Sequence, residues 1–353
     1  MSLVQRFFLP FTMSSYILVT GASGFVAMHV IKLALELGYG VIGTIRSERA
    51  AESVRRVFPE SLARLLLFKV SDISKPESFK PAFTASPVRA VINLASPLVN
   101  NPKDVKSEVL DPAIQSGTSI LTAALQYGGI SMERVIHVSS FTACLNLSLS
   151  NNTSYRYTSA DWNPLTYDEA AEGGSMTAYM GSKALAEKAM WTWMRDQKPS
   201  YEMVSIVPSA IFGPCVGPVQ LDNINLSTRM LWELVEPSPD PPVYNSHHLG
   251  CWIDVRDVAK CLLRAVDVPE AAGKRLLVAQ RCHWQLVRDE ARRVLPELRD
   301  RIKPGKPGSW KDDAAVTYDV DGTEAAKILD IRYRPLHECL RDTYLQLMQA
   351  QKH

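Results

Sequence analysis

The sequence predicts an α/β fold with a doubly wound parallel sheet and a smaller, mainly C-terminal α+β lobe. Short apolar runs alternate with helix-like segments over residues 16–208, which is the pattern that right-handed βαβ crossovers produce. The first run leads through a glycine-rich turn into a helix, and beyond residue 208 the alternation fades into loops and separate helices. We therefore expect a tail at 1–15, a sheet domain at 16–208 to which the chain returns at about 250–270, and a lobe at 209–249 and 271–353.

Composition and charge exclude several classes of protein. The 353 residues have a net charge of +2, so no strongly basic surface favours nucleic acid or anionic membranes. No apolar run reaches the roughly 20 residues of a membrane span, and the tail, which starts at Met1 or Met13, is too short for a secretory signal. The six scattered cysteines favour reduced thiols in a cytoplasmic protein. His247-His248 has no third ligand nearby, so we expect no metal.

The first strand and the turn after it suit a dinucleotide. The apolar run 16–20 precedes a glycine-rich segment, and a helix is expected at 28–37. Gly21 permits a tight turn, Gly24 lets the backbone approach a pyrophosphate, and Ala27 lets the helix pack closely on the strand. The phosphates would lie at the positive N-terminus of the helix. The alternative is an ordinary strand-to-helix turn.

The second and third strands end in charged candidates for cofactor binding. Arg46 follows the strand expected at 41–45, where an arginine suits the 2′-phosphate of NADP and an acidic residue would suit NAD. The alternative is a surface arginine at the start of a helix. Asp72 follows the strand expected at 65–70, where its carboxylate would accept from the adenine amine or cap a turn.

The remaining strands of the sheet are expected at 90–97, 134–138 and 203–207, with a helix at 105–126. Small residues at the end of the fourth strand, among them Ala95, leave room for the cofactor ribose. Ligands of doubly wound sheets bind at the carboxyl ends of the strands. All of these candidates would therefore meet at one edge of the sheet.

Tyr179-Met180-Gly181-Ser182-Lys183 opens the helix expected at 178–196 and carries the predicted chemistry. Its spacing puts the phenol and the ammonium on one helix face. A nearby cation is expected to lower the tyrosine pKa, so that the phenol can give a proton to an alkoxide near neutral pH. Ser140, at the end of the fifth strand, would donate to a carbonyl oxygen as charge develops on it. Ser139 competes for this role, but its side chain should point the other way. Alternatively, the tyrosine and lysine form an ordinary solvated helix face.

These motifs resemble a known superfamily. Thr20-Gly21-x-x-Gly24-x-x-Ala27, Ser140 and Tyr179-x-x-x-Lys183 are similar to the extended short-chain dehydrogenase/reductases. Further segments resemble one branch, the fungal NADPH-dependent methylglyoxal/isovaleraldehyde reductases, which are relatives of dihydroflavonol 4-reductases and cinnamoyl-CoA reductases. These segments are Trp162-Asn163-Pro164, 178–188, Phe212-Gly213-Pro214 and 253–259. The likeness runs from about Tyr16 to the C-terminal helix.

The resemblance implies a Rossmann fold that binds NADPH and a Ser140–Tyr179–Lys183 triad that reduces a ketone or aldehyde. The hydride would come from the nicotinamide and the proton from Tyr179, while Lys183 would also bind the nicotinamide ribose. The implied cofactor contacts are Gly21, Gly24, Phe25, Val26, Arg46, Asp72, Ala95, Tyr179, Lys183, Pro208 and Ser209. The sequence departs from the pattern of this branch at two places. Gln115-Ser116 stands where many members have Asn-Gly, and Leu98 stands where many have an aromatic residue.

The second half is expected to bind the substrate over the nicotinamide. Helices are expected at 226–235, 284–294, 320–329 and 336–349, and a small strand at 276–279. The segment 251–259 would carry the return to the main sheet, with its charged residues holding the domain together. Leu98, Phe141 and Tyr157 are candidates for the substrate pocket, and either aromatic ring could equally be a packing residue.

Other functions on this fold remain open. A sugar-nucleotide dehydratase needs an acidic residue beside the serine, whereas Phe141 and Thr142 lie there. A non-catalytic NADP-sensing protein would lose Tyr179 or Lys183, and both are present. The patterns leave open whether a reductase would be a housekeeping aldehyde reductase or a ketoreductase of secondary metabolism. They also leave open whether it is a monomer or a homodimer.

Overall fold

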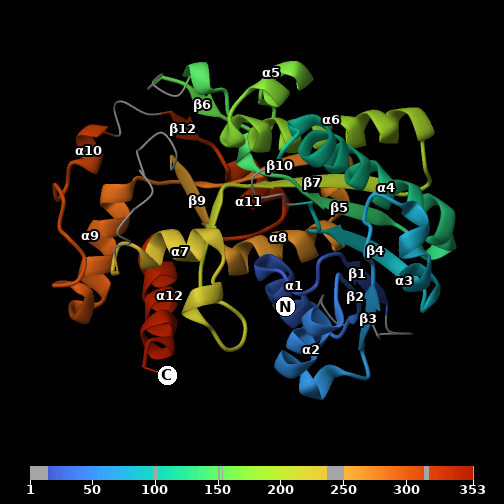
Figure 1. Cartoon of the computed structure of the whole chain (residues 1–353), viewed down its shortest axis with the longest axis horizontal. Coiled ribbons are helices and arrows are strands. Elements are labelled where there is room, and N and C mark those ends of the chain that lie inside the picture. Colours follow the sequence, from blue (N-terminus) through green and yellow to red (C-terminus); the bar gives the residue numbers. More distant parts are fainter. Residues whose placement is uncertain are drawn as a thin grey trace, which may run out of the picture.

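A seven-stranded parallel sheet forms the centre of the computed structural model, which describes residues 15–97, 102–149, 152, 154–236, 250–313 and 318–352 (Figure 1). The strand order is β10-β7-β5-β4-β1-β2-β3, so the order reverses beside β1. This confirms the predicted doubly wound sheet. The strands are β1 (Tyr16–Val19), β2 (Gly40–Ile45), β3 (Leu65–Lys69), β4 (Val88–Asn93), β5 (Arg134–Val138), β7 (Glu202–Pro208) and β10 (Arg275–Val278).

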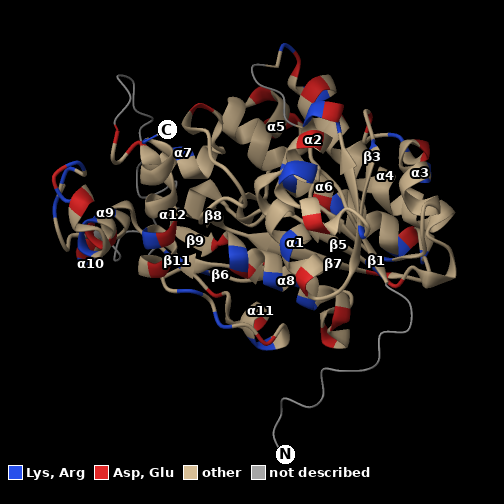
Figure 2. Cartoon of the chain, turned by 90° about the horizontal axis from the view of Figure 1, so that it is seen from below, with Lys and Arg blue, Asp and Glu red and all other residues tan. Residues whose placement is uncertain are grey.

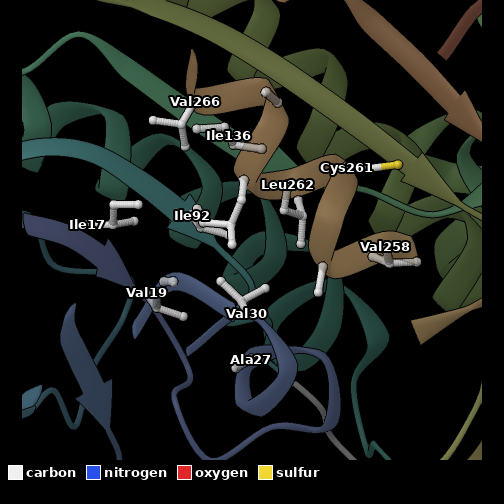
Figure 3. Close-up of a cluster of buried hydrophobic side chains, with 14 of the residues drawn as sticks. Ile17, Val19, Ala27, Val30, Ile92, Ile136, Val258, Cys261, Leu262 and Val266 are labelled. Carbon is white, nitrogen blue, oxygen red and sulfur yellow. The ribbon is translucent and has the colours of Figure 1, made fainter. Parts of the chain in front are cut away.

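Helices cover both faces of this sheet because each strand is apolar on both sides. On one face, Ile17 and Ile136 pack beneath Val30 of α1 and Leu262 of α8 (Figure 3). Leu18, the residue after Ile17, points to the opposite face and packs with residues of α3, α4 and α6. The helices are α1 (Phe25–Glu36), α2 (Glu48–Val57), α3 (Lys80–Thr84), α4 (Asp111–Tyr127), α6 (Ser175–Gln197) and α8 (Val255–Asp267).

Two helix starts differ from the sequence prediction. Helix α1 begins at Phe25, directly after Gly24, so the glycine turn is shorter than the apolar pattern indicated. A π-helical turn, Lys106–Leu110, precedes α4. Helix α2 begins directly after Ser47, whose hydroxyl accepts from the backbone N–H of Ala50 and caps the helix.

A second region contains two small sheets and its own core. Strands β8 (Ala210–Phe212), β9 (Cys251–Asp254) and β11 (Gln280–Arg281) form one sheet, and β6 (Arg156–Tyr157) pairs with β12 (Asp319–Val320). Phe212, Trp252 and Tyr344 are among the buried side chains of this core. The helices of this region are α7 (Leu226–Trp232), α9 (Trp284–Val294), α10 (Trp310–Asp313) and α12 (Leu336–Ala350). Of the other two helices, α5 (Tyr167–Glu172) packs against α6, and α11 (Thr323–Ile328) packs on the core of the main sheet beside β10.

The return of the chain to the main sheet differs from the expectation. Helix α8 packs on the main sheet as expected of 250–270, but β9 pairs with β8 and β11 instead. The seventh strand of the main sheet is β10, which pairs in parallel with β7. A short apolar run does not reveal which sheet it joins. The boundaries of the lobe remain a prediction.

The charged residues of 251–259 hold the two regions together. The buried Asp254 accepts from the Arg256 guanidinium at 2.7 and 2.9 Å, and Arg256 also pairs with Asp342 of α12 at 2.6 Å. Asp257, likewise buried, pairs with Arg334. These contacts join the start of α8 to the C-terminal segment, as the sequence predicted.

The surface carries charges of both signs. Figure 2 shows lysine, arginine, aspartate and glutamate interspersed over the helices of the described part of the chain. Within those residues, no helix is both long enough and apolar enough to cross a bilayer.

Candidate active site

The carboxyl ends of β1 and β4 meet at the glycine turn. Gly21 has a φ of +66°, a conformation that favours glycine, and its N–H donates to the Thr44 hydroxyl of β2 at 3.3 Å. The Thr20 hydroxyl donates to Asn93 at 2.8 Å and accepts from the N–H of Ala95 at 2.9 Å. A Cβ added to Gly21 would lie 3.4 Å from the Cα of Ala95. The turn and the small residues after β4 therefore pack together.

This turn has the features that a pyrophosphate needs. Phe25 and Val26 form the first turn of α1 and are half-buried, while Gly24 before them is exposed. The first N–H groups of a helix lack partners within that helix and attract anions. Gly24 has no Cβ to block the approach, and one added there would lie 3.2 Å from the Gly21 carbonyl oxygen.

Arg46 and Asp72 lie at the ends of β2 and β3. Arg46 is exposed and makes no hydrogen bond or ion pair to any other described residue. Asp72 accepts from the Ser74 hydroxyl at 2.6 Å and the Ser74 N–H at 3.0 Å, and both bonds lower the pKa of its carboxyl. The predicted turn cap at Asp72 is confirmed, while its adenine contact remains a prediction.

Ser140, Tyr179 and Lys183 come together at the same edge of the sheet. The Ser140 hydroxyl lies near the Tyr179 phenol, close enough to lower the pKa of the phenol. The Lys183 Nζ lies 5.9 Å from the centroid of the Tyr179 ring and donates to the Ser96 hydroxyl at 3.0 Å. Sequence reasoning gave Ser96 no role, although it follows Ala95 in the predicted turn. Ser96 thus holds the lysine where the carboxyl end of β4 meets α6.

The expected depression of the Tyr179 pKa by Lys183 is wrong for this structure. Tyr179 keeps 36% of its surface exposed, but burial of its hydroxyl end raises the pKa of the phenol, and the nearby Ser140 hydroxyl only partly offsets this. Burial also lowers the pKa of Lys183 to about 8. The ammonium points to Ser96 rather than to the phenol, so its charge does not compensate for the burial.

Ser139 and Ser140 serve different partners, as adjacent residues in extended backbone should. The Ser139 hydroxyl donates at 2.6 Å to Glu187, whose side chain is fully buried. Glu187 also accepts from the Ser205 hydroxyl at 2.5 Å and from the Arg275 Nε at 2.9 Å. Burial favours the neutral acid, but the Arg275 guanidinium, together with His137 and the Ser139 hydroxyl, outweighs it and holds the pKa of Glu187 below its usual range.

Arg275 of β10 extends this buried network to the loop between β5 and α6. Its guanidinium donates to the carbonyl oxygens of Ser159 and Asp161 at 2.8 and 2.6 Å, and it stacks 3.9 Å from the centroid of the Trp162 ring. Glu187 lies one turn after Lys183 on α6, so a single ion pair connects the catalytic helix, the loop and the edge strand. Sequence reasoning missed Glu187 and Arg275, because their pairing is visible only in the fold.

Several predicted pocket residues lie elsewhere. Phe141 and Tyr157 are 6% and 1% exposed and pack with Tyr318, with ring centroids 5.0 to 5.7 Å apart. The structure therefore favours the packing alternative for both, because Tyr155 of the loop and Tyr318, directly before β12, fill the space around them. Leu98 and His247-His248 lie outside the described residues.

Pro208, Ser209 and Ser116, which the sequence singled out, have clear positions in the structure. Pro208 ends β7, and Ser209 is buried with its N–H donating to Val278 at 3.2 Å. Their contact with the cofactor remains a prediction. Ser116, at the position of the departure in α4, donates to Ala113 within the helix at 3.0 Å. Its hydroxyl is thus engaged within α4.

The family is decided by sequence comparison. The model of the NAD dependent epimerase/dehydratase family matches residues 17–279. The chain belongs to this family. The match confirms the resemblance to the extended short-chain dehydrogenase/reductases, and it covers the main sheet, the glycine turn and α6.

Individual relatives align over nearly the whole chain. The NADPH-dependent methylglyoxal reductase GRE2 of Saccharomyces cerevisiae is 32% identical over 338 residues, which are 94% of this chain and 98% of that protein. The crystal structure of yeast methylglyoxal/isovaleraldehyde reductase Gre2 with NADPH has a TM-score of 0.88 at 31% identity, covering 96% of this chain and 99% of that one. The ketoreductase azaE of Aspergillus niger is 28% identical over 346 residues, 96% of this chain and 99% of that protein.

Proposed function

We propose that this protein is an NADPH-dependent reductase that converts a ketone or aldehyde into an alcohol. The observation that carries the proposal is the meeting of Ser140, Tyr179 and Lys183 at the sheet edge where the glycine turn also lies. The relatives named as NADPH-dependent and as ketoreductases support the same reaction class.

The residues at this edge fit NADPH. The glycine turn brings the N–H groups at the start of α1 to this edge with no Cβ at Gly24 to block a pyrophosphate. Arg46, whose side chain has no partner among the described residues, suits a 2′-phosphate. Lys183 would bind the nicotinamide ribose, and Ala95 leaves room for it. When bound, NADPH supplies the hydride.

Three side chains would complete the reduction. The Ser140 hydroxyl donates a hydrogen bond to the substrate carbonyl oxygen as negative charge develops there. Tyr179 gives its proton to that oxygen, which its raised pKa permits because the phenol stays protonated at neutral pH. Lys183, whose ammonium donates to Ser96 beside Tyr179, would bind the nicotinamide ribose and hold it next to the phenol.

The test is NADPH consumption, followed by absorbance, with methylglyoxal, bulky aryl ketones and polyketide-like aldehydes. We expect turnover with NADPH well above that with NADH. The Tyr179→Phe variant should bind NADPH normally, since it keeps the ring, and should lose turnover by about 10²-fold or more. Unchanged turnover in this variant would remove Tyr179 from the mechanism. The substrate that reacts best will separate a small-aldehyde reductase from a tailoring ketoreductase.

A second candidate on this fold is a sugar-nucleotide epimerase or dehydratase, the reaction class in the family's description. The surroundings of Ser140 disfavour a dehydratase. Phe141 and Thr142 follow the serine, and the nearby acid Glu187 is fully buried and paired with Arg275. A buried, paired carboxylate is a poor acid or base for a substrate. Product analysis with sugar nucleotides would decide between the two.

A further inference from the structure

The hydrogen bonds around Ser140 determine which way its proton points. The Ser140 Oγ accepts from the Thr142 hydroxyl at 2.9 Å and from the Thr142 N–H at 3.2 Å. A serine hydroxyl has two acceptor lone pairs and one proton. Because Thr142 supplies a donor for each lone pair, the Ser140 proton is directed away from Thr142 and stays available to a substrate oxygen.

Thr142 is itself fixed by a buried asparagine. Its carbonyl oxygen accepts from the Asn163 side-chain amide at 2.9 Å, and the Asn163 N–H donates to the Ala143 carbonyl at 2.8 Å. Asn163 is 1% exposed, and its own carbonyl oxygen accepts from Lys188 of α6 at 2.9 Å. Thr142 is thus joined through Asn163 to the helix that carries Tyr179. This gives a physical role to Asn163 in the Trp162-Asn163-Pro164 motif.

We propose that Thr142 is a positioning residue for the reduction, which holds the Ser140 oxygen as an acceptor so that the Ser140 proton is donated to the substrate carbonyl. This inference rests on the proposed reductase function. Donation by Thr142 also polarises the Ser140 hydroxyl, because successive hydrogen bonds strengthen one another in a site of low dielectric. The effect grows with the charge on the carbonyl oxygen, so it acts on the transition state more than on substrate binding.

The test compares Thr142→Val, which keeps the branched shape and loses the hydroxyl, with Thr142→Ser, which keeps the hydroxyl. We expect Thr142→Val to lower kcat about tenfold, the worth of one well-placed hydrogen bond. Its KM for NADPH should stay unchanged, and Thr142→Ser should retain most of the wild-type kcat. Thermal unfolding and NADPH fluorescence confirm that each variant is folded and binds the cofactor.

A second pair of variants separates positioning from a purely structural effect. In a Ser140→Ala background, Thr142→Val should cause no further loss of kcat, because the hydroxyl that Thr142 orients is gone. An equal loss in both backgrounds would overturn the proposal, as would a Thr142→Val enzyme with wild-type kcat. If the wild type itself reduces no carbonyl in the panel, the proposed function fails and this inference fails with it. If the wild type is active and Thr142→Val has the same kcat, this inference fails and the proposed function still stands.

Discussion

The proposed cofactor edge and the proposed catalytic centre lie side by side but are built differently. At the cofactor edge, two features come from the backbone, a glycine with positive φ and the N-terminus of α1, and the third is the exposed Arg46, which has no side-chain partner among the described residues. At the catalytic centre, contacts between buried side chains hold the helices and strands together, above all the ion pair between Glu187 and Arg275. Changes at the centre should therefore affect stability strongly, and changes at the edge should mainly affect cofactor binding.

The largest effect is expected from Arg275→Met, which leaves the Glu187 carboxylate buried and without its cation. The free energy of unfolding should fall by about 3–5 kcal/mol, because an unpaired buried charge is costly. Denaturant titration measures this. Glu36→Gln is the matched control, since Glu36 pairs with Lys32 where both side chains are 54% exposed, and its loss should cost at most about 1 kcal/mol. Equal losses in the two variants would contradict the comparison.

Lys183→Met is expected to raise the free energy of unfolding, by less than Arg275→Met lowers it. The folded-state pKa of Lys183, about 8, lies below its ordinary value of 10.5. Between these pH values the unfolded chain binds more protons than the folded one, so stability of the wild type rises with pH. Below pH 8 the folded protein carries the full cost of a buried ammonium.

Without NADPH, Lys183→Met should therefore be more stable than the wild type below pH 8, by ~2 kcal/mol. This advantage should shrink as the pH rises from 8 to 10.5, and turnover should be lost throughout. Thermal unfolding across this pH range measures the stability. Lys32→Met, at an exposed position, should show no such pH dependence. A Lys183→Met protein that is less stable than the wild type at pH 7 would refute the assigned shift.

Gly21→Ala tests the backbone of the cofactor edge. A side chain at a φ of +66° is strained, so stability should fall by roughly 1–2 kcal/mol. The dissociation constant for NADPH should rise tenfold or more, because the new methyl group narrows the turn. NADPH fluorescence measures the affinity. Gly129→Ala is the control, since its φ of +65° is similar but no atom lies near the added Cβ. It should lose stability and keep NADPH affinity.

Arg46→Ala should have the smallest effect on stability, because Arg46 is exposed and has no partner among the described residues. Its effect on selectivity should be clear. The preference for NADPH over NADH in kcat/KM should fall by about tenfold or more, which corresponds to one charge-assisted contact to phosphate. Arg49→Ala serves as the neighbouring control. If the preference for NADPH over NADH stays unchanged, another residue must recognise the 2′-phosphate.

The sequence predicted the backbone of the glycine turn better than the packing around Tyr179, for a physical reason. Gly21 and Gly24 act through their own backbone and immediate neighbours, so local pattern identifies them. The β9 run, by contrast, was placed in the wrong sheet, because pairing depends on which edge is free. Tyr157 was a candidate for the pocket, but partners from β12 bury it.

The direction of the pKa shift of Tyr179 also depends on surroundings that the sequence pattern does not reveal. The spacing to Lys183 is readable in the sequence, but burial of the hydroxyl and the direction of the lysine are not. The pairing of Glu187 with Arg275 was equally invisible, since nothing in a sequence pattern links a helix residue to an edge strand that lies much later in the chain.

That pairing also has a consequence for how the chain folds. Glu187 and Arg275 are 88 residues apart in the sequence, and contacts between such distant residues form late. During synthesis, residues 16–208 emerge with six of the strands of the main sheet before Arg275 exists. Until then, burial of the Glu187 carboxylate is unfavourable. We therefore expect α6 to reach its final packing against the sheet only after β10 has been added, so that the proposed catalytic centre is among the last parts of the fold to form.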